Sequence, residues 1–224
     1  MTTARERWYP ADPPPSPRRL RKHALADDVR ALIADVLMLD VEAASEDELA
    51  EVEASLARAR KAVAALPDIR HQGLFVGDDS SLFERSPLSG RVNALAAPLS
   101  LHFEGELTKG HAVYGEAYEG PPGLVHGGFV ISAFDDLLGV AQAASGIAGL
   151  TGTLSVRLHS GTPLHQRIDY EAGVLEVQGR KIVAWGKSFF QDTLCAEATG
   201  IFIEPRGGHP VHAVMAAGRR DREA

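Results

Sequence analysis

The residues best suited to catalysis lie in one short stretch, which reads GPPGLVHGGFVISAFDDLLG. Gly127 and Gly128 open an apolar, helix-like segment, and bare N–H groups at a helix start suit a developing negative charge. Asp135 and Asp136 follow about two turns into that segment, where apolar neighbours make a charge costly to bury. Together these residues could supply amides for an oxyanion and a carboxylate that acts on water.

Only one of the two aspartates can point squarely at a site, because successive helical residues lie about 100° apart. A carboxylate half-buried in an apolar groove should have a raised pKa, which suits a general base near neutral pH. His126, directly before the glycines, either fixes the turn by hydrogen bonding or holds the substrate. The chain carries no GxSxG nucleophile motif, and Cys195 fits a small core residue.

The pattern around this stretch predicts the elements that must position it. A long helix is expected at about 127–144, with Gly173 marking a bulge in a later strand. Short strands are expected at 99–107, 111–118, 154–158, 168–177, 181–191 and 194–203. Because a sheet with one open face needs a cover, we expect an α+β fold in which an antiparallel sheet wraps around one long central helix.

An N-terminal helical hairpin precedes this unit. Ser45 followed by Glu48 forms a capping box, and Pro67 should stop the second helix. We expect a structural or regulatory role for the hairpin, with a coiled-coil partner site as the alternative. The predicted organisation is a flexible arm at 1–23, a helical hairpin at 24–67, a loop segment at 68–97, the sheet domain at 98–205 and a tail at 206–224.

Composition narrows the class of protein. The chain has 224 residues and a net charge of −7, and 45% of its residues are hydrophobic. This supports a packed core and argues against nucleic acid as the main partner. Cys195 is the only cysteine, so an intrachain disulfide is excluded. No apolar run is long enough for a membrane span or an export signal, so we expect a cytoplasmic protein.

The order and spacing of several motifs resemble those of a known family. The HGG turn lies nine residues before Asp135, and the later motifs are Thr151–Val156, Pro163–Leu164, Gly179–Lys181, Ala196–Thr199 and Ile201–Ile203. Over roughly residues 98–204 the chain resembles the hotdog-fold acyl-CoA thioesterases of the PaaI-like and THEM type. The resemblance implies a hotdog fold and hydrolysis of an acyl-CoA to free acid and CoA.

The resemblance also implies roles for individual residues. It implies Asp135 as the catalytic carboxylate and an amide of Gly127 or Gly128 on the thioester carbonyl. It implies that a hydroxyl of Thr151 or Thr153 positions water or substrate. Sites in this family lie between protomers, so a homodimer or a dimer of dimers is expected. Some members carry an Asn or Gln upstream of the His, where this chain reads EGPP, so another group must supply that contact.

The remaining candidates concern substrate binding. Phe134 could shape an acyl pocket, and Arg180 and Lys181 could meet the phosphates of CoA, although a surface charge is the alternative for both cations. Asp136 is expected to be a solvated or interface charge. The histidines lack companions at ligand spacing, so no metal site is expected. No dinucleotide or Walker motif occurs, and no cofactor beyond the CoA of the substrate is implied.

Two other functions fit the same fold. A non-catalytic acyl-CoA sensor or scaffold would use the hairpin and basic arm as its output element, but it would not need Asp135 inside an apolar helix. A hotdog hydratase or dehydratase would pair an Asp with a His placed to exchange a proton with carbon, and His126 lies on the wrong kind of turn for that.

Overall fold

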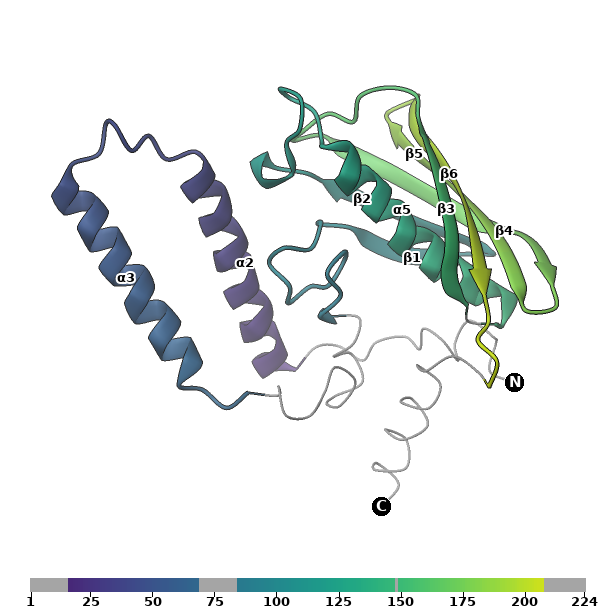
Figure 1. Cartoon of the computed structure of the whole chain (residues 1–224), viewed down its shortest axis with the longest axis horizontal. Coiled ribbons are helices and arrows are strands. Elements are labelled where there is room, and N and C mark those ends of the chain that lie inside the picture. The colour runs from purple at the N-terminus through teal and green to yellow at the C-terminus, as the bar shows by residue number, and fades with distance from the viewer. Residues whose placement is uncertain (1–15, 69–83, 148, 208–224) are drawn as a thin grey trace, which may run out of the picture.

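The computed structural model describes residues 16–68, 84–147 and 149–207, and a curved sheet dominates it (Figure 1). The sheet has six strands in the order β1-β2-β4-β5-β6-β3, and each neighbouring pair is antiparallel. The strands are β1 Ser100–Glu104, β2 Leu107–Val113, β3 Leu150–Leu158, β4 Arg167–Gln178, β5 Lys181–Phe190 and β6 Thr193–Ile203. Strands β1 and β3 therefore form the two edges of the sheet.

One helix, α5 (Gly127–Ala141), lies against the concave face of this sheet. Its residues Phe134, Leu137 and Leu138 are fully buried and form the centre of the core. Glycines in the facing strands let the helix approach, because a Cβ on Gly186 or Gly200 would lie 3.0 Å from Leu138. This arrangement confirms the predicted α+β hotdog fold, a sheet wrapped around one central helix.

The sheet departs from the predicted strands in several places. Strand β1 ends at Glu104, β2 begins at Leu107 inside the first predicted strand, and β3 begins at Leu150, four residues before its predicted start. The second strand ends at Val113, and a short 3-10 helix, η2 (Glu116–Tyr118), replaces its predicted end. The bulge predicted at Gly173 lies instead between Val174 and Glu176. Gly173 pairs in register with Trp185, and a Cβ there would lie 3.0 Å from the indole nitrogen, so this glycine makes room for a ring.

The N-terminal hairpin consists of α2 (Pro17–Leu37) and α3 (Glu46–Ala64). Helix α2 begins earlier than predicted, so residues 17–23 of the predicted arm are helical. The reason is local, because the Ser16 side chain accepts a hydrogen bond from the Arg19 amide and proline is favoured at a first helical position. The rest of the predicted arm, residues 1–15, lies outside the described residues.

Helix α3 starts with the predicted capping box. The Glu48 amide donates to the Ser45 hydroxyl at 3.3 Å, and the Ser45 amide donates to the Glu48 carboxylate at 2.9 Å. Of the predicted loop segment, residues 69–83 are not described, and most of the predicted tail, 208–224, also lies outside the described ranges. No helix in the described part of the chain is long and apolar enough to cross a membrane.

Candidate active site

The loop before α5 is closed by its own hydrogen bonds. The Gly120 amide donates to the Leu124 carbonyl at 2.9 Å, and the Gly123 amide donates to the Glu119 carboxylate at 2.7 Å. Gly123 has a φ of 75°, a conformation that favours glycine. The His126 amide donates to the Tyr118 carbonyl at 2.8 Å, which fixes the point where α5 begins. The start of the helix is therefore held rigidly.

His126 caps α5. Its Nδ1 accepts a hydrogen bond from the Gly128 amide at 3.0 Å, so the neutral ring carries its proton on Nε2. The geometry favours the turn-fixing interpretation of His126. It also contradicts the prediction that Gly128 offers its amide to substrate, because the cap occupies that amide. No described residue accepts a hydrogen bond from the Gly127 amide, which makes Gly127 the available donor.

Asp135 meets a hydroxyl from the sheet edge. Thr151 on β3 donates to Oδ1 of Asp135 at 3.0 Å, and the carboxylate is half-buried. The Asp135–Thr151 pair brings together two predicted residues that are far apart in sequence. A hydrogen bond to one carboxylate oxygen fixes the rotamer and leaves the other oxygen for a reactant.

A bulge in β3 decides which threonine reaches Asp135. Thr151 pairs with Phe202, and Thr153 pairs with Ile201, so Gly152 is the extra residue between them. Phe202 belongs to the core beneath α5, and paired residues share a sheet face. Thr151 therefore faces α5, while Thr153 faces the opposite side. Thr153 therefore cannot contact Asp135 of its own chain, and its predicted role in positioning substrate stays a prediction.

Asp136 lies under a loop that we call the covering loop (residues 84–98). Ser86 donates to Oδ2 of Asp136 at 3.3 Å, and the Ser89 hydroxyl also bonds this carboxylate. Burial raises the pKa of Asp136, although the two hydroxyls partly oppose the shift. The prediction of a solvated charge at Asp136 is therefore wrong, while an interface role stays a prediction. The covering loop, which contacts α5 from a distant part of the chain, is the reason for this burial.

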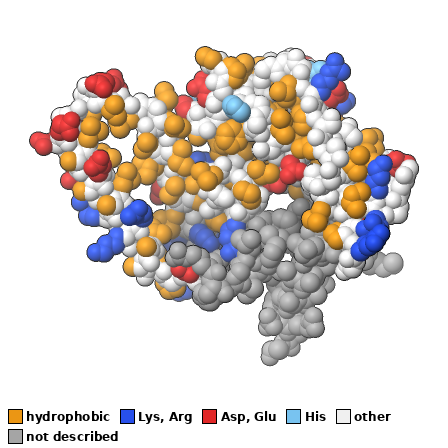
Figure 2. All heavy atoms as spheres, viewed as in Figure 1, with side chains coloured by type: hydrophobic (Ala, Val, Ile, Leu, Met, Phe, Trp, Pro, Cys, Tyr) orange, Lys and Arg blue, Asp and Glu red, His pale blue; other side chains and the backbone are white. Residues whose placement is uncertain are grey.

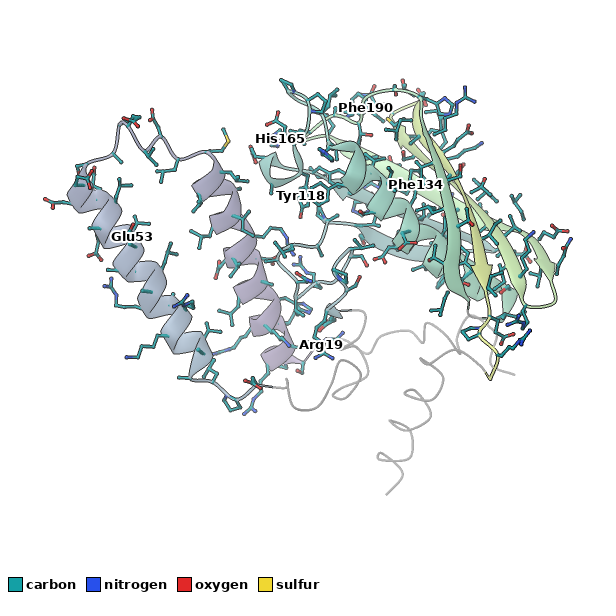
Figure 3. The ribbon with its side chains drawn as sticks, viewed as in Figure 1. Arg19, Glu53, Tyr118, Phe134, His165 and Phe190 are labelled. Atoms are coloured by element: carbon teal, nitrogen blue, oxygen red, sulfur yellow. The ribbon has the colours of Figure 1, made fainter. Side chains whose placement is uncertain are left out.

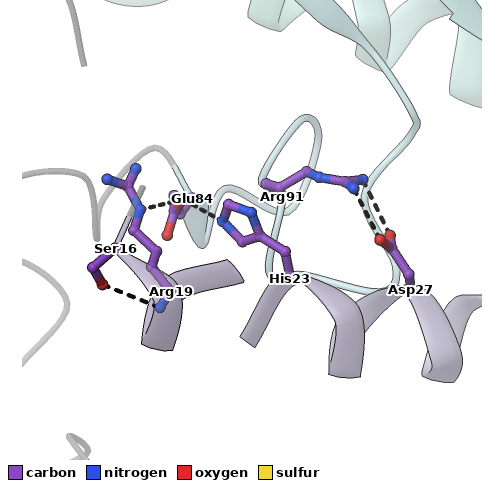
Figure 4. A network of polar contacts seen from close by, with 6 residues as sticks. All are labelled: Ser16, Arg19, His23, Asp27, Glu84 and Arg91. Atoms are coloured by element: carbon purple, nitrogen blue, oxygen red, sulfur yellow. Dashed lines mark hydrogen bonds and ion pairs between the residues drawn. The ribbon is translucent and has the colours of Figure 1, made fainter. Parts of the chain in front are cut away.

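The first helix of the hairpin holds the covering loop in place (Figure 4). Glu84 receives hydrogen bonds from Arg19 at 2.7 Å and from His23 at 2.6 Å, and all three side chains are mostly buried. Arg91 forms an ion pair with Asp27 at 2.9 Å. Helix α2 is thus connected to Asp136 through the loop that buries it.

Phe134 is a core residue. Its side chain is fully buried between α5 and the sheet, and its ring packs edge-on against Tyr170 at a centroid distance of 6.0 Å (Figure 3). The structure therefore contradicts the prediction that Phe134 lines a substrate pocket. The Tyr170 hydroxyl is 2.7 Å from the Tyr114 hydroxyl, and burial raises the pKa of Tyr114 to about 12, which keeps it neutral.

The two predicted cations lie at the same end of the sheet as Thr151. Lys181 pairs with Ile203, which pairs with Leu150, so Lys181 is two strands, or about 10 Å, from the β3 edge. Arg180 is exposed and donates to the Glu204 carbonyl at 2.7 Å. No cluster of metal-binding side chains occurs among residues 16–68, 84–147 and 149–207.

Sequence reasoning missed three residues that shape the site. Ser86 and Ser89 lie about 50 residues before Asp136, and only the fold brings them to it. Glu119 had a local signal, because a carboxylate four residues before a glycine can accept a bond across a tight turn. Its bond to Gly123 gives Glu119 a structural role in the turn before α5.

The amide and the carboxylate of one protomer are too far apart to share a substrate. Gly127 and Asp135 are eight residues apart on α5, which corresponds to about 12 Å along the helix axis. A reacting carbonyl needs both groups within about 3 Å. One chain therefore carries the two halves of a site without assembling them around the same atom.

Solved structures similar to this chain include members of one superfamily. No family model matches the chain. A solved thioesterase superfamily protein is 30% identical, covering 86% of this chain and 97% of its own at a TM-score of 0.68. Fold neighbours include mouse thioesterase superfamily member 2 (15% identity, 47% and 80% covered, TM-score 0.44) and a mutant of the phenylacetic acid degradation protein PaaI from Thermus thermophilus (17%, 47% and 92%, 0.44).

Proposed function

Since this chain belongs to the thioesterase superfamily, we propose that it is an acyl-CoA thioesterase, which hydrolyses the thioester of an acyl-CoA to the free acid and CoA. One observation carries the proposal. The helix that presents the unoccupied Gly127 amide also presents Asp135, whose carboxylate is held by Thr151. An amide for the oxyanion and an oriented carboxylate are the two groups that thioester hydrolysis needs.

The roughly 12 Å between these groups leads us to propose that the site is shared in a homodimer. The Gly127 amide of one protomer would stabilise the oxyanion while Asp135 of the partner subunit acts on the same carbonyl carbon. The edge strand β3 supports this arrangement, because Thr151 lies on it and its Leu150 and Leu158 are 51% and 52% exposed. An unpaired strand edge with exposed leucines favours pairing with a second copy.

The reaction can follow two routes. In the first, Asp135 takes a proton from water, the water oxygen attacks the carbonyl carbon, and the C–S bond breaks as the CoA thiolate leaves and is protonated. In the second, the carboxylate attacks directly, the thiolate leaves, and water then hydrolyses the resulting anhydride. Neither route requires a metal or a redox cofactor.

The position of the cations supports CoA as the leaving group. Arg180 is exposed and Lys181 half-buried, and both lie beside the sheet end that carries Thr151. In our proposal they bind the phosphates of CoA, for which Arg and Lys are the usual partners. The β3 edge can join two protomers, and two such dimers can associate further into a dimer of dimers.

The test is thiol release from short, long and aromatic acyl-CoAs by the wild type, Asp135→Asn and Asp136→Asn. The last variant makes the same chemical change one residue away, on a carboxylate covered by the loop. We expect Asp135→Asn to lose about 10²-fold or more in kcat/KM, and Asp136→Asn to retain most of it. Thr151→Val should lose less, because it removes only the bond that orients Asp135.

Thermal unfolding of each variant separates a chemical loss from a folding defect. A folded Asp135→Asn protein with wild-type activity would show that Asp135 is not the catalytic carboxylate. If the wild type binds acyl-CoA but releases thiol from no member of the panel, the thioesterase proposal fails and the protein is better described as a non-catalytic acyl-CoA sensor.

A further inference from the structure

The two helices of the hairpin run side by side without packing closely against each other (Figure 1). Helix α2 is fixed to the covering loop through Glu84, but α3 buries none of its side chains. Hydrophobic side chains lie along both helices (Figure 2). Most helical stability in proteins comes from packing of an apolar face, and the apolar face of α3 is left exposed by its own chain.

Both helices carry an apolar seam with the spacing of a coiled coil, in which apolar residues alternate three and four positions apart. On α3 and the residues after it, Val52, Leu56 and Val63 are 47%, 38% and 59% exposed. On α2, Leu25, Val29 and Val36 are 52%, 47% and 52% exposed. The complete seams are Leu25, Val29, Leu32, Val36 and Leu39 on the first helix and its end, and Leu49, Val52, Leu56, Ala59, Val63 and Leu66 on the second.

The exposed charges of the two helices run in opposite orders along the sequence. The start of α3 is acidic and its end basic, which agrees with its own macrodipole. Helix α2 is basic at its start and acidic later, against its own macrodipole. The charged residues are Arg18, Arg21, Lys22, Asp28 and Asp35 on α2, and Glu46, Asp47, Glu48, Glu51, Glu53, Arg58, Arg60 and Lys61 on α3.

These orders oppose closure of the hairpin within one chain. The short connection makes α2 and α3 antiparallel, so the basic start of α2 lies at the same end as the basic end of α3. Figure 2 shows Lys and Arg side chains at that end of α3 and acidic side chains near the connection. Packing the two helices closely against each other would bring like charges together along their whole length, which is unfavourable.

A second α3 that runs parallel to α2 would bring its acidic and basic ends beside regions of opposite charge. Its acidic start would lie beside the basic start of α2, and its basic end beside Asp28 and Asp35. The same helix would run antiparallel to the first α3, and there too acidic starts would face basic ends. Only another copy of the chain can supply α3 in that direction.

We propose that the hairpin is a dimerisation element, in which the seam of α3 from a second copy packs against the seams of α2 and α3. The two copies exchange α3 about a two-fold axis, so that both seams are buried and the charges pair. This interface is separate from the β3 edge, and it does not depend on the thioesterase activity.

The first test is sedimentation velocity of the full chain over a wide concentration range. Leu56→Asp places a carboxylate on the α3 seam, and Ala54→Asp is the matched control on the outer face of the same helix. We expect Leu56→Asp to weaken one association step by about 100-fold, because it would bury an unpaired charge, and Ala54→Asp to behave as wild type. Equal association of Leu56→Asp and wild type would overturn the proposal.

The second test measures geometry and does not rely on loss of association. The α3 seam is centred next to Arg58, so nitroxide labels on Arg58→Cys of two copies should lie close together. Labels on Glu48→Cys should be about 30 Å apart if the helices are antiparallel. Cys195 is buried, and the chain without an introduced cysteine is the control.

Equal distances at the two positions would indicate a parallel pair and contradict the proposal. The absence of a short distance at Arg58 in an associated protein would mean that the copies are joined elsewhere, such as through the β3 edge, and would also contradict it.

Discussion

Helices α5 and α3 reach the same secondary structure by opposite means. Helix α5 contains three glycines and several β-branched residues, which are poor helix formers, yet its Phe134 and Leu138 are fully buried. Helix α3 is rich in Ala, Glu and Arg and begins with a capping box, yet it buries no side chain. The comparison shows that tertiary packing can replace local helix propensity, and that strong propensity can maintain a helix whose partner is missing.

The largest effect should come from the packing of α5. Phe134→Ala removes a fully buried ring beside Tyr170, and we expect it to lower the free energy of unfolding by about 3–5 kcal/mol. Urea unfolding measures the change. A loss below about 1 kcal/mol would mean that α5 does not depend on packing, and the contrast with α3 would fail.

A smaller effect is expected where the hairpin meets the covering loop. Glu84→Ala leaves Arg19 and His23 without their shared carboxylate in a mostly buried setting, which should cost about 1–3 kcal/mol. Hydrogen exchange should show α2 and the covering loop opening together. Glu53→Ala on α3 is the control, since Glu53 is exposed and should change little (Figure 3). If hydrogen exchange in α2 were the same in Glu84→Ala and wild type, Glu84 would not be what holds α2 against the covering loop.

Within the hairpin, a single substitution can remove the capping box that starts α3. Ser45→Ala deletes the cap that accepts the Glu48 amide and should destabilise the first turn by about 1 kcal/mol. Hydrogen exchange at the start of α3 should rise while α5 stays protected. Ser55→Ala, in the middle of the helix, provides the matched control. If exchange in α5 also rose, the two helices would not be independent.

The smallest effect concerns pH and the buried carboxylate on α5. Burial raises the pKa of Asp136, so the folded state binds its proton more tightly than the unfolded state. The free energy of unfolding should therefore fall as the pH rises from the ordinary carboxyl pKa of Asp136 to its raised value, and stay lower above it. Asp136→Asn should reduce this fall, as unfolding measured across that range can show. An identical pH profile in both proteins would contradict the raised pKa.

Local patterns predicted much of the fold. The apolar period gave the central helix and the later strands, and Ser45 with Glu48 identified the start of α3. The HGG motif singled out the start of α5, and the structure brings Thr151 to Asp135, a contact that the sequence did not predict. These predictions succeed because period, capping and motif spacing act within a few residues.

The sequence by itself determined which helices and strands form, where α5 begins and which residues could perform chemistry. The tertiary structure alone decided how those residues are used. The covering loop partly buried Asp136, the bulge at Gly152 turned Thr153 away, the cap by His126 left Gly127 as the free amide, and packing placed Phe134 in the core. Register, loop placement and burial depend on contacts between distant segments, which no local pattern specifies.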